Sequence, residues 1–257
     1  GRQWVPEGKL SGIFEYCVEQ NEGMTAWVIG TFMKRLALTD GGTLKRIHSG
    51  PYIETFRSTR KIGETKLELD ISLHAGERKV FFNLTADWRE IGDKERGTPN
   101  LRVLFPVEAD GPEARYEIPF GSVSRDLKDG EEVTGQRWAD LSEKDGQGVA
   151  LVNSSKYGFS LEGDTLSMTL LRASIDPDPL PDLGEHVIEY ALVPHGEGWS
   201  IGRSTAAGEE ANVPLVVLSC DTHEGDLPPV KSFVRVDNWN VRLAALKKAQ
   251  DDDGIVL

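Results

Sequence analysis

The stretch Thr65–Leu73 reads TKLELDISL, in which polar and apolar residues alternate. Successive side chains of a β-strand point to opposite faces, so this period of two places the leucine and isoleucine side chains on one face. Ala75–Arg78 has the composition of a turn, and Lys79–Trp88 follows with a second apolar run. The two runs predict a β-hairpin with one buried face.

The same pattern recurs along most of the chain. Short apolar runs are separated by turn signals such as Asp110–Pro112, Asp129–Gly130 and Glu162–Asp164. The pattern predicts an all-β fold, a large antiparallel β-sandwich. Its further strands are expected at Leu101–Pro106, Ala114–Phe120, Gly148–Asn153, Thr165–Leu171, Val187–Val193 and Leu215–Ser219.

One segment near the carboxy terminus has helical spacing instead. Asn240 can cap the apolar face of Val241–Ala249, and Asp251–Gly254 would end the helix. The sequence therefore predicts one short helix there. Ile255–Leu257 then begins a strand, from which we expect the parent chain to continue.

Size and charge limit the class of protein. With 257 residues, 39% of them hydrophobic, the chain can bury a sizeable core. The net charge of −13, without a dense Lys/Arg cluster, argues against a nucleic-acid partner. Apolar runs are far shorter than the about 20 residues of a membrane span, so we expect no membrane partner. Cys17 and Cys220 both lie in apolar runs and are expected to be buried.

The residues alone reveal no catalytic machinery. None of the five histidines belongs to an H-x-D, H-x-H or H-E-x-x-H group, so no metal site is predicted in this chain. Asp176–Pro179 lacks the ligand spacing of a calcium loop and is expected to be a rigid solvated loop. A pair of carboxylates for glycoside hydrolysis cannot be selected from 42 acidic residues.

A series of segments, in order, resembles the carboxy-terminal part of the family 38 glycoside hydrolases, the α-mannosidase family. The resemblance covers about residues 45–257 and is weaker over the first 40 residues. It predicts amino-terminal strands in residues 1–44 that join from a preceding part of the parent chain, and the family's β-sandwich in 45–257, truncated at Leu257. The segments are Val103–Val107, Ala114–Gly121, Gln136–Ser142, Gly148–Phe159, Leu166–Ser174, Pro177–Pro179, Asp182–His186, Tyr190–His195, Lys231–Phe233, Val236–Val241 and Ala245–Ala249.

The resemblance implies a supersandwich fold like that of galactose mutarotase. It also implies that the catalytic residues lie in a different domain of the parent protein. In this family an amino-terminal α/β domain holds the zinc ligands, the aspartate nucleophile and the acid/base, and none of those motifs is present here. We therefore expect this chain to lack catalytic residues, to hold no zinc and to be inactive alone. Its partners would be the catalytic domain of the same protein and, through the complete enzyme, an α-mannoside; zinc would belong to the full-length parent.

The resemblance also nominates a substrate-binding loop at Lys156, Tyr157 and Gly158. An aromatic ring can pack on a sugar face, and glycine lets the backbone approach a ligand. We expect Tyr157 to be partly exposed at one end of the sandwich; the alternative is a strand-end turn with Tyr157 in the core.

A second loop, Asp178–His186, contributes the candidates Asp178, Glu185 and His186. In the alternative interpretation, Glu185 and His186 simply pair with each other at the start of a strand. Arg137, Trp138 and Asp140 are interpreted as structural: an Arg–Asp ion pair with tryptophan packing.

Two other functions stay open. The chain could be a stand-alone carbohydrate-binding or structural β-sandwich, or a mutarotase-type epimerase that uses a His and a Glu as acid and base, with His186 and His195 as the candidate histidines. A reading frame that extends several hundred residues upstream, with an H-x-D motif, would favour the α-mannosidase interpretation.

Overall fold

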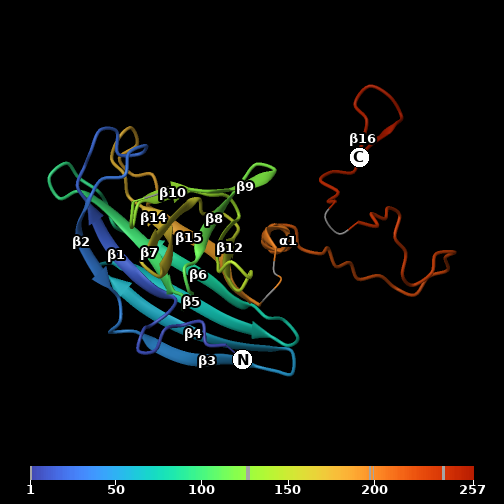
Figure 1. The fold of residues 1–257 in the computed structure, drawn as a ribbon, viewed down its shortest axis with the longest axis horizontal. Coiled ribbons are helices and arrows are strands. Elements are labelled where there is room, and N and C mark those ends of the chain that lie inside the picture. Colours follow the sequence, from blue (N-terminus) through green and yellow to red (C-terminus); the bar gives the residue numbers. More distant parts are fainter. Residues whose placement is uncertain (1, 126–127, 197, 199, 239–240) are drawn as a thin grey trace. The chain divides into compact units, whose positions relative to one another are not determined.

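The computed structural model describes residues 2–125, 128–196, 198, 200–238 and 241–257. The chain divides into two compact units, Gly1–Pro214 and Leu215–Leu257. The first is a β-sandwich built from a six-stranded and a nine-stranded sheet (Figure 1). This arrangement confirms the predicted all-β antiparallel fold.

The six-stranded sheet has the order β10-β13-β14-β7-β1-β2, and its paired strands are antiparallel. Its strands are β1 (Ile13–Glu19), β2 (Phe32–Ala37), β7 (Thr98–Pro106), β10 (Glu132–Thr134), β13 (Gly158–Glu162) and β14 (Thr165–Arg172).

The nine-stranded sheet has the order β3-β4-β5-β6-β15-β12-β11-β8-β9, again with antiparallel pairs. Its strands are β3 (Thr43–Ser49), β4 (Ile53–Ile62), β5 (Thr65–His74), β6 (Val80–Trp88), β8 (Glu113–Ile118), β9 (Gly121–Ser124), β11 (Trp138–Ser142), β12 (Gly148–Asn153) and β15 (Gly184–His195).

The predicted hairpin is β5 and β6, in register with Leu69 opposite Leu84. Both side chains are buried in the core between the sheets. Phe82 lies at the centre of this core: its ring stacks on Tyr190 at 4.9 Å and meets Phe105 edge-on at 5.6 Å. The alternation of the sequence therefore identified the face that holds the sheets together.

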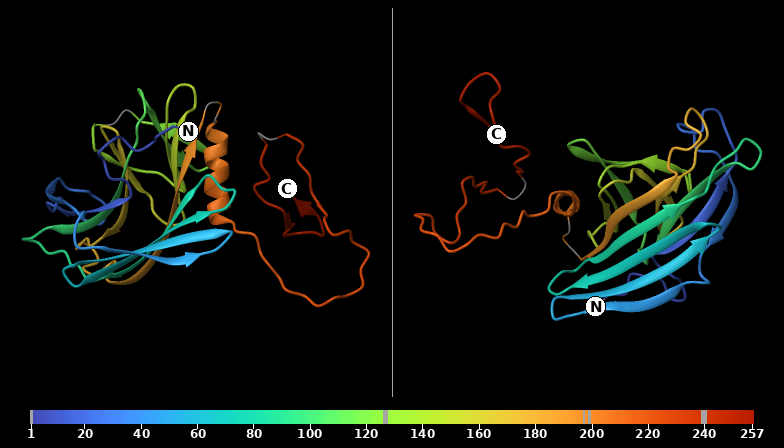
Figure 2. Two further views of the ribbon diagram at one scale, coloured as in Figure 1. Left: turned by 90° about the horizontal axis from the view of Figure 1, so that it is seen from below. Right: turned by 180° about the vertical axis from the view of Figure 1, so that it is seen from behind.

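A helix that the sequence analysis missed, α1 (Ile201–Asn212), packs on the outer side of β11 and β12 (Figure 2). It turns small residues toward the sheet: Ser204, Ala207 and Gly208 are its buried positions. A Cβ at Gly208 would lie 2.8 Å from Cδ1 of Trp138, so glycine permits this close approach. Within the described residues, no helix has the length and apolar character to span a membrane.

The helix predicted at Val241–Ala249 is wrong. Asn240, its expected cap, lies outside the described residues, and residues 241–246 have no regular secondary structure. Then β16 (Lys247–Lys248) pairs with β17 (Ile255–Val256). The acidic turn between them stabilises a hairpin, because Gly254 N–H donates to Asp252 Oδ1 at 2.7 Å and Ala249 N–H donates to the Gly254 carbonyl at 2.8 Å. The signal interpreted as a helix stop is a hairpin turn.

Two further expectations fail in the second unit. Leu215–Ser219 forms no strand, and its valine and leucine side chains are exposed. Cys220 is exposed as well, whereas Cys17 is buried as predicted. An apolar run becomes a strand only when a neighbouring strand satisfies its backbone, and within the described residues no strand pairs with this run. The predicted boundary between residues 44 and 45 stays a prediction.

Candidate functional site

The loop between β12 and β13 is held by the side chain of Asn153, the last residue of β12. Its Oδ1 accepts hydrogen bonds from the backbone N–H groups of Ser155 at 2.9 Å and Lys156 at 2.6 Å, as in an Asx turn. The Tyr157 carbonyl accepts a further bond from Gly135 N–H at 2.9 Å. The backbone is thus fixed while the Tyr157 side chain is 57% exposed, as expected for a strand-end loop.

Asp182 connects this loop to the next candidate loop. The side chain of Lys156 is half-buried, and its removal from water lowers the pKa of the ammonium group, an effect that the negative charge of Asp182 opposes. The Asp182 carboxylate also accepts the backbone N–H of Arg172 at 3.0 Å, and its carbonyl bonds to Nε2 of His186 at 2.6 Å. The two loops nominated from the sequence therefore influence each other.

The other nominated residues have distinct surroundings. Asp178 is an exposed turn residue whose Oδ1 accepts the N–H of Leu180 at 3.0 Å. His186 bonds to the Asp182 carbonyl rather than to Glu185. Glu185 is exposed and lines a recess on the nine-stranded sheet.

A third loop, residues 20–31, lies beside the 173–183 loop (blue and orange in Figure 1). Thr25 joins them, because its buried Oγ1 accepts the N–H groups of Ile175 at 2.9 Å and Asp176 at 3.0 Å. The same loop carries Trp27, whose side chain is 73% exposed. The sequence analysis did not single out Trp27, because only the folded chain shows which tryptophans face solvent.

A buried ion pair between Arg172 and Glu19 holds the backbone of the 20–31 loop. Arg172 binds the carboxylate of Glu19 in a bidentate manner, with Nε–Oε1 and Nη2–Oε2 distances of 2.8 and 2.7 Å. Arg172 also donates to the carbonyls of Thr25 and Val28, and Asn100 Nδ2 donates to Glu19 at 3.0 Å. Glu19 is fully buried, so these partners replace the hydrogen bonds that its carboxylate would make with water.

The loop end, defined here as residues 20–31, 154–157 and 173–183, thus combines a rigid base with an exposed apolar rim. Exposed large apolar and aromatic side chains that gather on one part of a surface commonly mark a ligand or protein contact. Those of the loop end and its border are Met24, Trp27, Val28, Ile29, Tyr157, Leu180 and Leu183.

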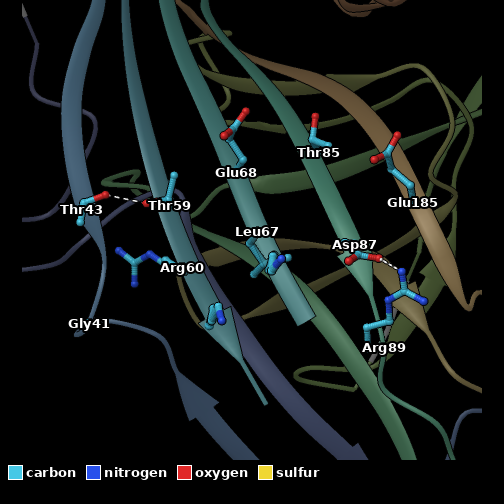
Figure 3. Close-up of a pocket in the computed structure, with 12 residues that line it drawn as sticks. Gly41, Thr43, Thr59, Arg60, Leu67, Glu68, Thr85, Asp87, Arg89 and Glu185 are labelled. Atoms are coloured by element: carbon cyan, nitrogen blue, oxygen red, sulfur yellow. Dashed lines mark hydrogen bonds and ion pairs between the residues drawn. The ribbon is translucent and has the colours of Figure 1, made fainter. Parts of the chain in front are cut away.

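The recess that contains Glu185 lies on the outward face of β3 to β6 and β15, with a volume of about 730 Å³ (Figure 3). It is lined by threonine hydroxyls and by charges of both signs. Thr43 and Thr59 bond at 2.6 Å, and Arg89 pairs with Asp87 at 2.6 Å. These groups suit a neutral ligand rich in hydroxyls, but the lining residues include no aromatic ring.

The predicted Arg137–Asp140 ion pair is not formed. Arg137 pairs with Glu117, and its backbone N–H donates to the same carboxylate at 2.7 Å. Asp140 instead faces His195 Nε2 at 3.1 Å and accepts a bond from Ser204 of α1. The expectation of tryptophan packing is correct, because Trp138 is fully buried. Arg137 directly precedes β11, and residues three positions apart along an extended chain point to opposite faces, so the two side chains do not meet.

The two histidines of the epimerase hypothesis lie at opposite ends of β15, about 30 Å apart at the rise of an extended strand. His195 is buried and bonds to Asp140 and to the Gly146 carbonyl, which leaves its ring no open approach. Within the described ranges, no cluster of three or more His, Cys, Asp or Glu side chains is placed to hold a metal ion.

Comparison with known proteins gives a consistent result. Residues 1–180 match the model of the glycosyl hydrolases family 38 C-terminal domain. The chain is 36% identical over 229 residues to Alpha-mannosidase 2C1 of Mus musculus, covering 85% of this chain and 21% of that protein. Alpha-mannosidase G of Dictyostelium discoideum is 29% identical over 238 residues, covering 84% and 20%. The chain thus spans about a fifth of the length of these relatives.

Among solved structures, a glycosyl hydrolase family 38 protein from Enterococcus faecalis superimposes with a TM-score of 0.72 at 15% identity, covering 85% of this chain and 30% of that one. An alpha-mannosidase from Enterococcus faecalis V583 gives 0.70, also at 15% identity, with 85% and 29% covered. At such identity the likeness shows a shared fold, and the family match covers well over half of the chain. The chain belongs to the C-terminal domain family of the family 38 glycosyl hydrolases.

Proposed function

We propose that this chain is the carboxy-terminal, non-catalytic part of an α-mannosidase that hydrolyses α-mannosides with retention, and that its loop end completes the substrate groove. The observation that carries the proposal is the loop end itself. Tyr157 and Trp27 are exposed aromatic side chains, yet the loop that carries each is held by hydrogen bonds to a buried side chain, Asn153 or Thr25. Rigid aromatic rings can contact a sugar face with little loss of conformational entropy.

The apolar rim has a second role in this proposal, as the surface that meets the catalytic domain of the same polypeptide. Met24, Leu180 and Leu183 are exposed there, and as aliphatic side chains they have no ring that could stack on a sugar. Apolar contacts of this kind suit a protein interface. Zinc would be held by the catalytic domain, because the described residues of this chain offer no cluster for it.

Tyr157→Ala in the complete protein is expected to lower kcat/KM for 4-nitrophenyl α-mannoside about 2- to 10-fold, the size of one lost aromatic contact. Thermal unfolding should hardly change, because a half-exposed side chain contributes little to the core. Steady-state kinetics and calorimetry of the same preparation measure both quantities.

Tyr52→Ala is the matched control: this tyrosine is 77% exposed in the turn between β3 and β4, away from the loop end. It should leave both quantities unchanged. Normal kinetics with a loss of several degrees in Tm for Tyr157→Ala would show that Tyr157 serves the core and would contradict the proposal.

A stand-alone carbohydrate-binding sandwich is the second candidate, favoured by the polar recess that Glu185 lines (Figure 3). Titration of this chain alone with an α-linked mannose oligosaccharide separates the two candidates. Binding that Glu185→Ala abolishes and Tyr157→Ala leaves intact would favour the stand-alone module. We expect the chain alone neither to hydrolyse α-mannosides nor to bind stoichiometric zinc.

A further inference from the structure

The short strand β10 borders the candidate loop and, among the described residues, pairs with β13 alone. Its Thr134 lies opposite Gly158, and Val133 lies opposite Phe159. Directly after it, Gly135 N–H donates to the Tyr157 carbonyl at 2.9 Å. A strand of three residues at the edge of a sheet is weakly bound by its backbone hydrogen bonds alone. Because the residue after β10 binds the Tyr157 carbonyl, a further contact that fixes β10 would also fix the backbone of Tyr157.

That contact is the side chain of Glu132, which passes over β13 to the following strand, β14. Its Oε2 accepts a hydrogen bond from the hydroxyl of Thr169. A Cβ at Gly158 would lie 2.4 Å from Oε1 of Glu132 and 3.4 Å from Cβ of Thr169. The carboxylate therefore occupies the space that a side chain at Gly158 would need. The backbone of Gly158 does not adopt a positive φ, so what glycine provides here is room for the end of the Glu132 side chain, which a larger residue would displace.

The surroundings of Glu132 disfavour the ionised form of its carboxyl group. Burial raises its pKa above the ordinary 4.5; Glu19 adds to the increase, while the Thr169 hydroxyl and the guanidinium groups of Arg102 and Arg172 oppose it. With a raised folded-state pKa, the stabilisation from proton binding is complete below 4.5 and is lost as the pH rises through the folded value.

We propose that Glu132 is a positioning residue for the Lys156–Gly158 loop. Its side chain spans Gly158, joins β10 to Thr169 and so sets the edge of the sheet on which Tyr157 lies. The consequence for substrate binding rests on the proposed function of the loop. The positioning itself does not, and the two can be tested separately.

A double-mutant cycle in the complete protein tests the contact. Gly158→Ala alone should lower Tm and raise KM, because the new methyl group displaces the Glu132 carboxylate from its bond to Thr169. Combined with Glu132→Ala, this displacement cannot occur, and the double variant should recover part of both losses. Strictly additive effects of the two substitutions would overturn the proposal.

Hydrogen exchange at the Gly135 amide reports loop position without any reference to activity. Glu132→Ala should accelerate this exchange about 10-fold or more, whereas Glu132→Gln, which keeps the bond to Thr169, should leave it near normal. Glu131→Ala, an exposed neighbour, is the control. If Glu132→Ala does not fold, Thr169→Val breaks the same bond from the other side and should accelerate the exchange equally.

The two hypotheses fail in different ways. Unchanged exchange in both Glu132→Ala and Thr169→Val would disprove the positioning role. Accelerated exchange with normal KM for Glu132→Ala and for Tyr157→Ala would retain the positioning role and contradict the proposed function. Glu132→Gln supplies a further readout: relative to the natural protein it should gain stability as the pH rises above about 4.5, because it cannot ionise.

Discussion

Replacing Glu19 with alanine is expected to reduce the free energy of unfolding by about 3–5 kcal/mol, the usual loss when one partner of a buried ion pair is removed. Glu19 is fully buried and accepts bonds from Arg172, Asn100 and the Gly30 N–H. Its removal leaves the Arg172 guanidinium in a largely buried position without its bidentate partner. The loop that carries Trp27 should loosen at the same time.

Chemical denaturation measures the loss, and hydrogen exchange of residues 20–31 measures the loosening. Glu68→Ala is the control, because Glu68 pairs with Arg57 at 2.8 Å on an exposed strand face and such pairs contribute about 0–1 kcal/mol. Equal losses in the two variants would contradict the assigned role of Glu19.

The second large effect is expected for Asp140→Ala, at about 3 kcal/mol or more. Asp140 is 1% exposed and connects three elements: Ser142 on its own strand, His195 of β15 and Ser204 of α1. Without the carboxylate, buried polar groups lose their shared partner. We expect α1 to separate from the sheet more readily, since its face is otherwise made of small residues.

Amide exchange in α1 should rise more than exchange in β5 or β6, which lie elsewhere in the sheet. Asp70→Ala, which removes a half-exposed partner of Arg57, is the matched control and should leave α1 protected. A uniform loss of protection across the sandwich would show that Asp140 stabilises the whole fold rather than the attachment of α1.

The sandwich could be predicted from the sequence because its signal is local. Alternation in Thr65–Leu73 indicates which face is turned to the core: Leu67 and Leu69 are buried, although Leu73 at the strand end is exposed. Gly148–Asn153 is β12 with the predicted bounds. The helices were predicted wrongly because their formation depends on contacts with distant parts of the chain. α1 is rich in glycine and small polar residues, and it is stabilised by its contact with Trp138 and Asp140 rather than by its own propensity.

The candidate site was predictable only in part. The family resemblance, together with the position of Tyr157 after a buried strand, led to the expectation of a partly exposed side chain, and Tyr157 is 57% exposed. Arg172 and Glu19 are 153 positions apart in sequence, and Thr25 lies 150 positions from Ile175, so no local pattern could connect them. Glu132 was missed for the same reason. Its proposed role depends on Gly158, 26 positions away in sequence, which leaves room for its carboxylate.

The central claim is that the loop end lines the groove in which an α-mannoside is bound, and the structure of the complete protein with such a ligand tests it most directly. The account predicts that Tyr157 or Trp27 packs within about 4.5 Å of the sugar, with the apolar rim covered by the catalytic domain. A structure in which the ligand is enclosed by other parts of the protein, and both aromatic side chains still face solvent, would contradict it.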